Sequence, residues 1–155
     1  MRRSDREVTD PMEIEAILSR AKVCHVAFET DGAPYLLPLN YGYEMQNGTL
    51  KLYFHGAFEG RKAELIQKRP RTGFAIDVEN GLIEAKTACG YGYRYESIVG
   101  SGVCEALEDV REKKRALCAI MRQQTGREFS FTDEQVSSCA VFCLTCGEFS
   151  AKRHE

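Results

Sequence analysis

The sequence contains no tryptophan, only four prolines, and no excess of charge of either sign. Lys and Arg number 21 against 23 Asp and Glu, so the basic excess that marks a nucleic-acid-binding protein is missing. No apolar run approaches the roughly 20 residues of a membrane-spanning helix, so we expect no membrane association. The charged N-terminus is not followed by an apolar stretch, so we expect no signal peptide and a cytoplasmic protein.

The length of 155 residues predicts one domain, spanning residues 1–155. Hydrophobic residues make up 43% and charged residues 28%, a globular composition that excludes a wholly disordered chain. Seven cysteines are an odd number, and the chain is not a small secreted one. We therefore expect reduced thiols rather than a disulfide framework.

Three turn signals predict antiparallel hairpins in the first half of the chain. Asp31-Gly32 separates residues 23–29 from 35–44, Asn47-Gly48 separates the latter from 49–54, and Asn80-Gly81 follows 72–77. Asn-Gly and Asp-Gly favour the positive-φ turns that join antiparallel strands. This spacing predicts a meander.

Helices are predicted between and after these strands. One begins at Pro11, where Asp10 can cap the first turn and Glu13 completes a pattern resembling a capping box. Others are expected at 58–68 and 109–124, and further strands at 94–107 and 140–149. Because strands dominate, the expected fold is mainly β, an α+β antiparallel barrel or curled sheet with peripheral helices.

Residues 35–43 predict a single strand whose two faces differ. Tyr and Leu side chains occupy one face, whereas Leu36, Pro38, Asn40 and Gly42 occupy the other. Pro and Gly inside a strand mark an edge, a bulge or the close approach of a ligand. Two interpretations stay open: a bent barrel strand, or a surface on which a flat cofactor lies.

Arg61 and Lys62 begin the helix predicted after the strand that ends at His55. Cations normally favour the other end of a helix, so this pair is misplaced unless an anion binds there. Arg offers phosphate a bidentate fork, and Lys adds a mobile charge. The alternative is two solvated charges with Glu59 as their counter-ion.

The three histidines differ in whether their positions suit a catalytic role. His55 ends a strand and is either a structural residue or a catalyst. His25 alternates with Val23 and Ala27 and is expected to be half-buried, whereas His154 is expected to be solvated in the tail. No His, Cys and carboxylate set has zinc spacing, so no metal site is predicted.

Cys139, Cys143 and Cys146 imitate the spacing of a three-cysteine iron–sulfur motif, but they lie in or beside a predicted strand. Strand alternation places Cys143 and Cys146 on opposite faces, so we expect them to pack as small apolar side chains. In the preceding strand, Gly100 and Gly102 share a face. This arrangement permits either sharp coiling or close contact with a ring, a ligand or a second chain.

Taken together, these segments resemble the FMN-binding split-barrel proteins related to pyridoxamine 5′-phosphate oxidase, and among them the 5-nitroimidazole resistance (nitroimidazole reductase) proteins. Three segments in register carry the resemblance: Ala-Pro-Tyr-Leu-Leu-Pro-Leu-Asn-Tyr at 33–41, Leu-Tyr-Phe-His-Gly-Ala at 52–57 with Gly-Arg-Lys at 60–62, and Tyr95-x-Ser97-Ile98-Val99-x-x-Gly102. The resemblance covers nearly the whole chain.

The resemblance implies a six-stranded antiparallel split barrel with flanking helices, and a homodimer with FMN sites at its interface. It implies cofactor-binding roles for ten residues: Pro38, Leu39, Asn40, Tyr41, His55, Ala57, Arg61, Lys62, Ser97 and Val99. Of these, the first four line the flavin ring, Arg61 and Lys62 hold the phosphate, and Ser97 and Val99 reach the flavin from the same or the partner chain. The arginine- and lysine-rich pattern that holds the substrate phosphate in true pyridoxamine phosphate oxidases is missing, which argues against vitamin B6 oxidation.

The expected function is therefore that of an FMN-dependent oxidoreductase reducing small flat acceptors such as nitroimidazoles, with His55 as the candidate catalytic residue. One alternative is a haem-binding or haem-degrading split-barrel protein with His25, His55 or His154 as axial ligand. Another is a non-enzymatic flavin-binding module.

Overall fold

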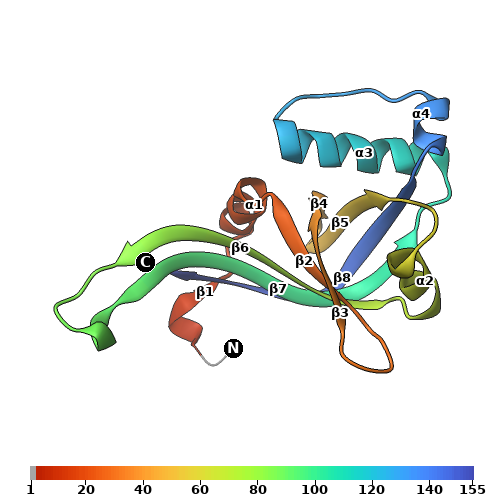
Figure 1. Ribbon diagram of the computed structural model, residues 1–155. Coiled ribbons are helices and arrows are strands. Elements are labelled where there is room, and N and C mark those ends of the chain that lie inside the picture. The colour runs from red at the N-terminus through yellow and green to blue at the C-terminus, as the bar shows by residue number, and fades with distance from the viewer. Residues whose placement is uncertain (1–2) are drawn as a thin grey trace.

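Antiparallel strands organise the chain, and the computed structural model describes residues 3–155 (Figure 1). The first two residues of the charged N-terminus considered above lie outside the described residues. The helices are η1 (Ser4–Arg6), α1 (Pro11–Arg20), α2 (Arg61–Lys68), η2 (Ala88–Gly90), α3 (Val110–Thr125) and α4 (Asp133–Ser137). The strands are β1 (Glu7–Val8), β2 (Val23–Phe28), β3 (Tyr35–Asn40), β4 (Gly42–Gln46), β5 (Thr49–Gly56), β6 (Arg71–Ile83), β7 (Gly92–Ala106) and β8 (Ala140–His154).

The strands form one sheet in the order β3-β2-β6-β7-β8-β5-β4, with β1 paired to β8. β3 and β4 are the two edges, so the curled sheet does not close between them. This confirms a mainly β, α+β split barrel. The described residues contain eight strands rather than six, partly because one predicted strand is divided and the short β1 adds another. The order is also not the simple meander expected of the N-terminal half.

Two hydrophobic cores lie on opposite sides of the sheet. The main core fills the barrel and includes Phe28, Phe54 and the α1 residue Leu18. A smaller core packs α3 against the other face of β5 and β8. Cys146 belongs to the main core and Cys143 to the smaller one, which confirms that they occupy opposite faces. All seven cysteines are free thiols.

Two of the three predicted turns are confirmed. Asp31-Gly32 lies between the paired strands β2 and β3, and Asn47-Gly48 joins β4 to β5 with φ values of 52° and 78°. The hairpin predicted at Asn80-Gly81 is wrong, because β6 continues through it to Ile83. Gly81 has φ of 106° at a register shift, so its positive φ serves a bulge in the long β6–β7 ribbon instead of a turn.

The single strand predicted over residues 35–43 is also wrong, because the chain breaks at Tyr41 between β3 and β4. Helix α3 lies directly on this break. A Cβ at Gly42 would sit 2.3 Å from the backbone nitrogen of Ile120, and Gln124 Nε2 donates to Tyr41 O at 2.9 Å. The alternation of faces does hold within β3, where the even-numbered residues are exposed.

The helix starts follow their capping residues. Asp10 accepts from Met12 N at 2.8 Å as expected, and Asp109 caps α3, but Glu13 bonds Arg153 rather than closing a capping box. Helix α2 begins at Arg61, three residues later than predicted, and α4 was not predicted. Among residues 3–155, no helix is long and apolar enough to cross a lipid bilayer.

Close strand contact explains the paired glycines of β7. A Cβ at Gly102 would lie 2.0 Å from Thr145 O, and one at Gly100 would lie 2.5 Å from Glu148 O. Both oxygens belong to β8, so sharp coiling against the neighbouring strand accounts for the glycines. β8 itself continues to His154, five residues beyond the predicted end.

Candidate functional site

The N-terminus of α2 differs from those of the other α-helices. Its N-cap residue, Gly60, has φ of 115° and supplies no side-chain cap, whereas Asp10, Asp109 and Thr132 cap α1, α3 and α4. The first backbone N–H groups of α2 are therefore available to an external acceptor. With the positive end of the helix dipole, they form a suitable place for an anion.

Arg61 adds a positive charge at this helix start. Its guanidinium lies over the ring of Tyr35, with Cζ 4.4 Å from the ring centroid, so β3 and α2 meet here. No carboxylate within residues 3–155 forms a salt bridge with Arg61, and the counter-ion pair considered for Glu59 is not formed. A guanidinium held by a ring and free of a carboxylate partner suits bidentate anion binding.

Lys62 points inward and joins α2 to the end of β5. Its Nζ donates to His55 O at 3.0 Å and lies 5.2 Å from the ring centroid of Phe142. Burial lowers the pKa of Lys62, because desolvation disfavours its charged form. The ammonium therefore braces the strand end. Two of its three N–H groups remain for another acceptor.

His55 presents a free imidazole beside this contact. Its backbone pairs with Val141 of β8, and its carbonyl accepts from Lys62, so the backbone fixes the strand end. The side chain is exposed, and none of the hydrogen bonds found in residues 3–155 involves its ring nitrogens. Ala57, the next predicted residue, is exposed at the start of the loop to α2.

The four predicted flavin-lining residues of β3 and the break after it fall on two faces. Pro38 and Asn40 are exposed, whereas Leu39 packs against the main core and Tyr41 is fully buried. Tyr41 donates its hydroxyl hydrogen to Leu18 O at 2.7 Å, and burial raises the pKa of this phenol. Asn40 Nδ2 donates to Lys22 O at 3.2 Å and to Gln124 Oε1 at 3.1 Å. Only Pro38 and Asn40 therefore offer side chains to a ligand outside the barrel.

We call the surface of β3, β2, β6 and β7 that points away from the main core the outer face. One row of register partners crosses it and continues onto β8: Pro38, His25, Ala75, Val99 and Ser150. Pro38 and Val99 therefore share this face but lie three strand spacings apart, about 14 Å. His25 is half-buried as expected, with Nδ1 3.6 Å from Asp77 Oδ1.

Ser97 carries an unusual hydroxyl in the next row. The residue is 9% exposed, and its Oγ is buried with no hydrogen-bond partner, the one such side-chain atom in residues 3–155. Its cross-strand neighbours are Asp77 and Lys152. An unsatisfied buried hydroxyl costs free energy, so it marks a position where a ligand atom would be stabilising.

Aromatic and basic side chains surround Ser97, and sequence patterns did not reveal them. Lys152 Nζ lies 5.3 Å from the ring centroid of Tyr95, and His154 lies 5.9 Å from the same ring. Desolvation opposes the ionisation of Tyr95, but a hydrogen bond from Arg6 and the charge of Lys152 outweigh it and lower the pKa. His154 is not solvated in a tail as expected, because it ends β8 with Nδ1 2.8 Å from Tyr93 O.

A buried ion-pair network holds β7 in place beside Ser97. The carboxylate of Glu96 is 3% exposed and bonds Arg20, Arg153 and Asn80. Burial alone would raise the pKa of Glu96. The three hydrogen bonds outweigh burial and hold this pKa below its ordinary value. These contacts join α1, β6 and β8 to the strand that carries Ser97 and Val99.

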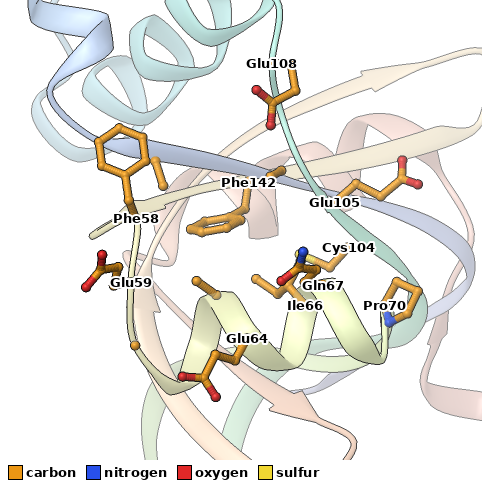
Figure 2. Close-up of a pocket in the computed structure, with 14 residues that line it drawn as sticks. Phe58, Glu59, Glu64, Ile66, Gln67, Pro70, Cys104, Glu105, Glu108 and Phe142 are labelled. Atoms are coloured by element: carbon orange, nitrogen blue, oxygen red, sulfur yellow. The ribbon is translucent and has the colours of Figure 1, made fainter.

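A cavity of about 780 Å³ lies elsewhere, between α2, the end of β7 and the start of β8 (Figure 2). None of the ten predicted cofactor-binding residues lines it. Within residues 3–155, no group of three His, Cys, Asp or Glu side chains is placed to hold a metal ion.

A family model described as pyridoxamine 5′-phosphate oxidase matches residues 10–153. The chain belongs to this family. The sequence resemblance is thereby confirmed, and the open eight-stranded sheet is this chain's form of the family's split barrel. No curated protein matches the chain.

Solved structures extend the comparison. A candidate 5-nitroimidazole antibiotic resistance protein from Bacteroides thetaiotaomicron is 32% identical, with a TM-score of 0.80 over 95% of this chain and 86% of that one. An FAD and haem binding protein from Mycobacterium smegmatis is 19% identical, with a TM-score of 0.80 over 97% of this chain and 74% of that one. An FAD-binding protein from Mesorhizobium loti is 20% identical, with a TM-score of 0.65 over 95% and 96%. The last two share the fold of this pyridoxamine 5′-phosphate oxidase family member.

Proposed function

We propose that this chain is an FMN-dependent oxidoreductase that reduces small flat acceptors such as nitroimidazoles. The observation that carries the proposal is the start of α2, where uncapped N–H groups and the unpaired guanidinium of Arg61 lie together. That arrangement suits the phosphate of FMN. The 32% identity to a candidate 5-nitroimidazole resistance protein supports the choice of acceptor.

The outer face fits the rest of a flavin. The buried, unpartnered Oγ of Ser97 could donate to a flavin carbonyl or accept from a flavin N–H, since such groups line the polar edge of the ring. Pro38 and Val99 offer apolar surface on the same face. Arg61, with Lys62 beside it, would hold the phosphate end.

When bound, the flavin would supply the electron pair that, with two protons, converts a nitro group to a nitroso group and water. The chain would position the acceptor and deliver protons. His55 is the candidate proton donor, because its imidazole is exposed at the strand end and free of hydrogen bonds within the described residues. An imidazole can donate or accept a proton near neutral pH.

We further propose a homodimer with the cofactor sites at its interface. The outer face exposes Leu36, Val99 and Val103, which are 59%, 43% and 43% exposed. Small residues, Ala27, Gly73 and Ala75, lie between them in the register. A second copy would cover this apolar surface, and it would bring one chain's Ser97 and Val99 close to the other chain's α2.

Binding of FMN, riboflavin and FAD to the purified protein tests the proposal. We expect FMN to bind more tightly than riboflavin, and the absorption spectrum to show flavin bands. A Soret band in the protein as purified, with no flavin binding, would favour the haem-binding alternative instead. Flavin binding without turnover of any nitro compound and reductant would favour a non-enzymatic flavin module.

A further inference from the structure

The cavity beside α2 has an apolar floor and an acidic rim. Its floor includes Ile66, Cys104 and Phe142, each at most 4% exposed. Figure 2 shows Glu59 and Glu64 on the side of α2, and Glu105 and Glu108 on the opposite side, at the end of β7 and after it. The cavity volume of about 780 Å³ is in the range of small-molecule sites.

The charge of the rim is only partly offset, by Lys62, whose Nζ lies 5.2 Å from the ring centroid of Phe142 on the cavity floor. None of the four glutamates is in a salt bridge formed within residues 3–155, and no Lys, Arg or His lines the cavity. Four carboxylates around a concave apolar surface concentrate a negative potential inside it. The excess of carboxylates favours cations over anions inside the cavity.

An exposed aromatic ring completes the rim. Phe58 lines the cavity and is 56% exposed, so its ring is accessible to a ligand in the cavity. The face of an aromatic ring attracts ammonium groups, and rings combined with carboxylates recognise organic cations in water. Phe58 therefore supplies a second feature that favours the same class of ligand.

The cavity adjoins the phosphate position proposed for FMN, because Gly60, the N-cap residue of α2, also lines the cavity. At 100° per residue, Ala63 and Ile66, which line the cavity, lie about 200° and 140° from Arg61 around the axis of α2. Arg61 instead contacts Tyr35 of β3. Arg61 and these two apolar residues thus lie on different sides of α2, whereas Glu64 lies about 60° from Arg61 around the same axis.

We infer that this cavity binds a small organic cation, an ammonium ion that carries an aromatic or branched apolar body. The body packs on Ile66 and Phe142, and the ammonium lies among Glu59, Glu64 and Glu105 with Phe58 beside it. This site does not depend on flavin binding, so it stands whether or not the proposed function does.

Calorimetric titration with benzyltrimethylammonium, benzyl alcohol and phenylacetate tests the site, on protein with and without FMN. The cation is expected to bind more tightly than the neutral and anionic probes, with an affinity that falls as salt rises. An exposed ion pair contributes about 1.4- to 5-fold in affinity, so the double variant Glu64→Gln/Glu105→Gln should bind the cation about 2- to 25-fold more weakly. Phe58→Ala should weaken binding as well.

Two control variants distinguish binding in the cavity from the general effect of removing a surface charge or an exposed ring. Glu84→Gln removes an exposed carboxylate on the distant β6–β7 connection, and Phe129→Ala removes a ring that is 42% exposed outside the cavity. Neither should change the affinity for benzyltrimethylammonium. Equal binding of benzyl alcohol or phenylacetate, or an unchanged cation affinity in the double variant, would overturn the inference.

Discussion

The ammonium of Lys62 occupies the space beside Gly56 that a side chain there would fill. A Cβ at position 56 would lie 2.5 Å from Nζ, and the same Nζ donates to the carbonyl oxygen of His55 at 3.0 Å. The end of β5 and the start of α2 are therefore joined by a contact that requires a residue without a side chain. In the proposed function, this contact fixes the position of the phosphate-binding helix start.

Gly56→Ala should weaken FMN binding while leaving the stability of the fold almost unchanged. The added methyl group displaces Nζ, which is the end of a flexible side chain, so the melting temperature should change little. A typical hydrogen bond contributes a net value of about 0.5–1.5 kcal/mol. Losing the one at the helix start should therefore weaken FMN binding about 2- to 12-fold. Gly32→Ala is the control, since a Cβ there meets no atom within 4 Å. Unchanged FMN affinity would contradict a role for Lys62 in cofactor binding.

Arg61→Ala should weaken FMN far more than riboflavin, because only FMN carries the phosphate. A hydrogen bond to a charged group contributes about 1.5–3 kcal/mol, which corresponds to about 10- to 150-fold in affinity. Fluorescence titration of both flavins measures the difference. Lys68→Ala, which removes an exposed cation at the other end of α2, should leave the ratio unchanged. Equal losses for FMN and riboflavin would place the phosphate elsewhere.

The proposed dimer predicts different effects for two equally exposed valines. Val103 on the outer face and Val110 at the start of α3 are both 43% exposed. Val103→Asp should produce monomers by light scattering, because it would bury a charge in the interface. Val110→Asp should leave the dimer intact, since a carboxylate suits the first turn of a helix. A monomeric parent protein that still binds one FMN per chain would contradict an interface site.

Glu96 should confer stability that depends on pH. Because its pKa is lower in the folded protein than the ordinary value of 4.5, its contribution is present above that value and is lost as the pH falls through the folded pKa. At pH 7, Glu96→Gln should lower the free energy of unfolding by about 1.5–3 kcal/mol, the value for hydrogen bonds to a charged group. Urea unfolding should show this difference shrinking in acid. Glu148→Gln, at an exposed carboxylate, should show no such trend.

Local chemistry explains which parts of the fold were predictable. Asn47-Gly48 makes its turn from its own backbone preferences, and Asp109 caps α3 through its own side chain. Asn80-Gly81 carries the same turn signature but lies within a strand, because pairing with β7 extends the ribbon past it. The break at Tyr41 depends on α3, about 80 residues later, so no local pattern could reveal it.

In the candidate site too, only the features set by nearby residues could be predicted from the sequence. The charges of Arg61 and Lys62 at a helix start were visible in sequence, since the helix and its first turn are local features. The surroundings of Ser97 depend on the register of β7 with β8, which brings Lys152 opposite it across 55 residues. The acidic cavity likewise draws its glutamates from α2 and from the distant end of β7.

Anaerobic titration of the reduced, FMN-reconstituted protein with a 5-nitroimidazole tests the central claim most directly. The account predicts that bound flavin regains its oxidised absorption as the nitro compound is added, and faster than free reduced FMN at the same concentration. Failure of the protein to bind FMN, or reoxidation no faster than that of free reduced FMN, would contradict it.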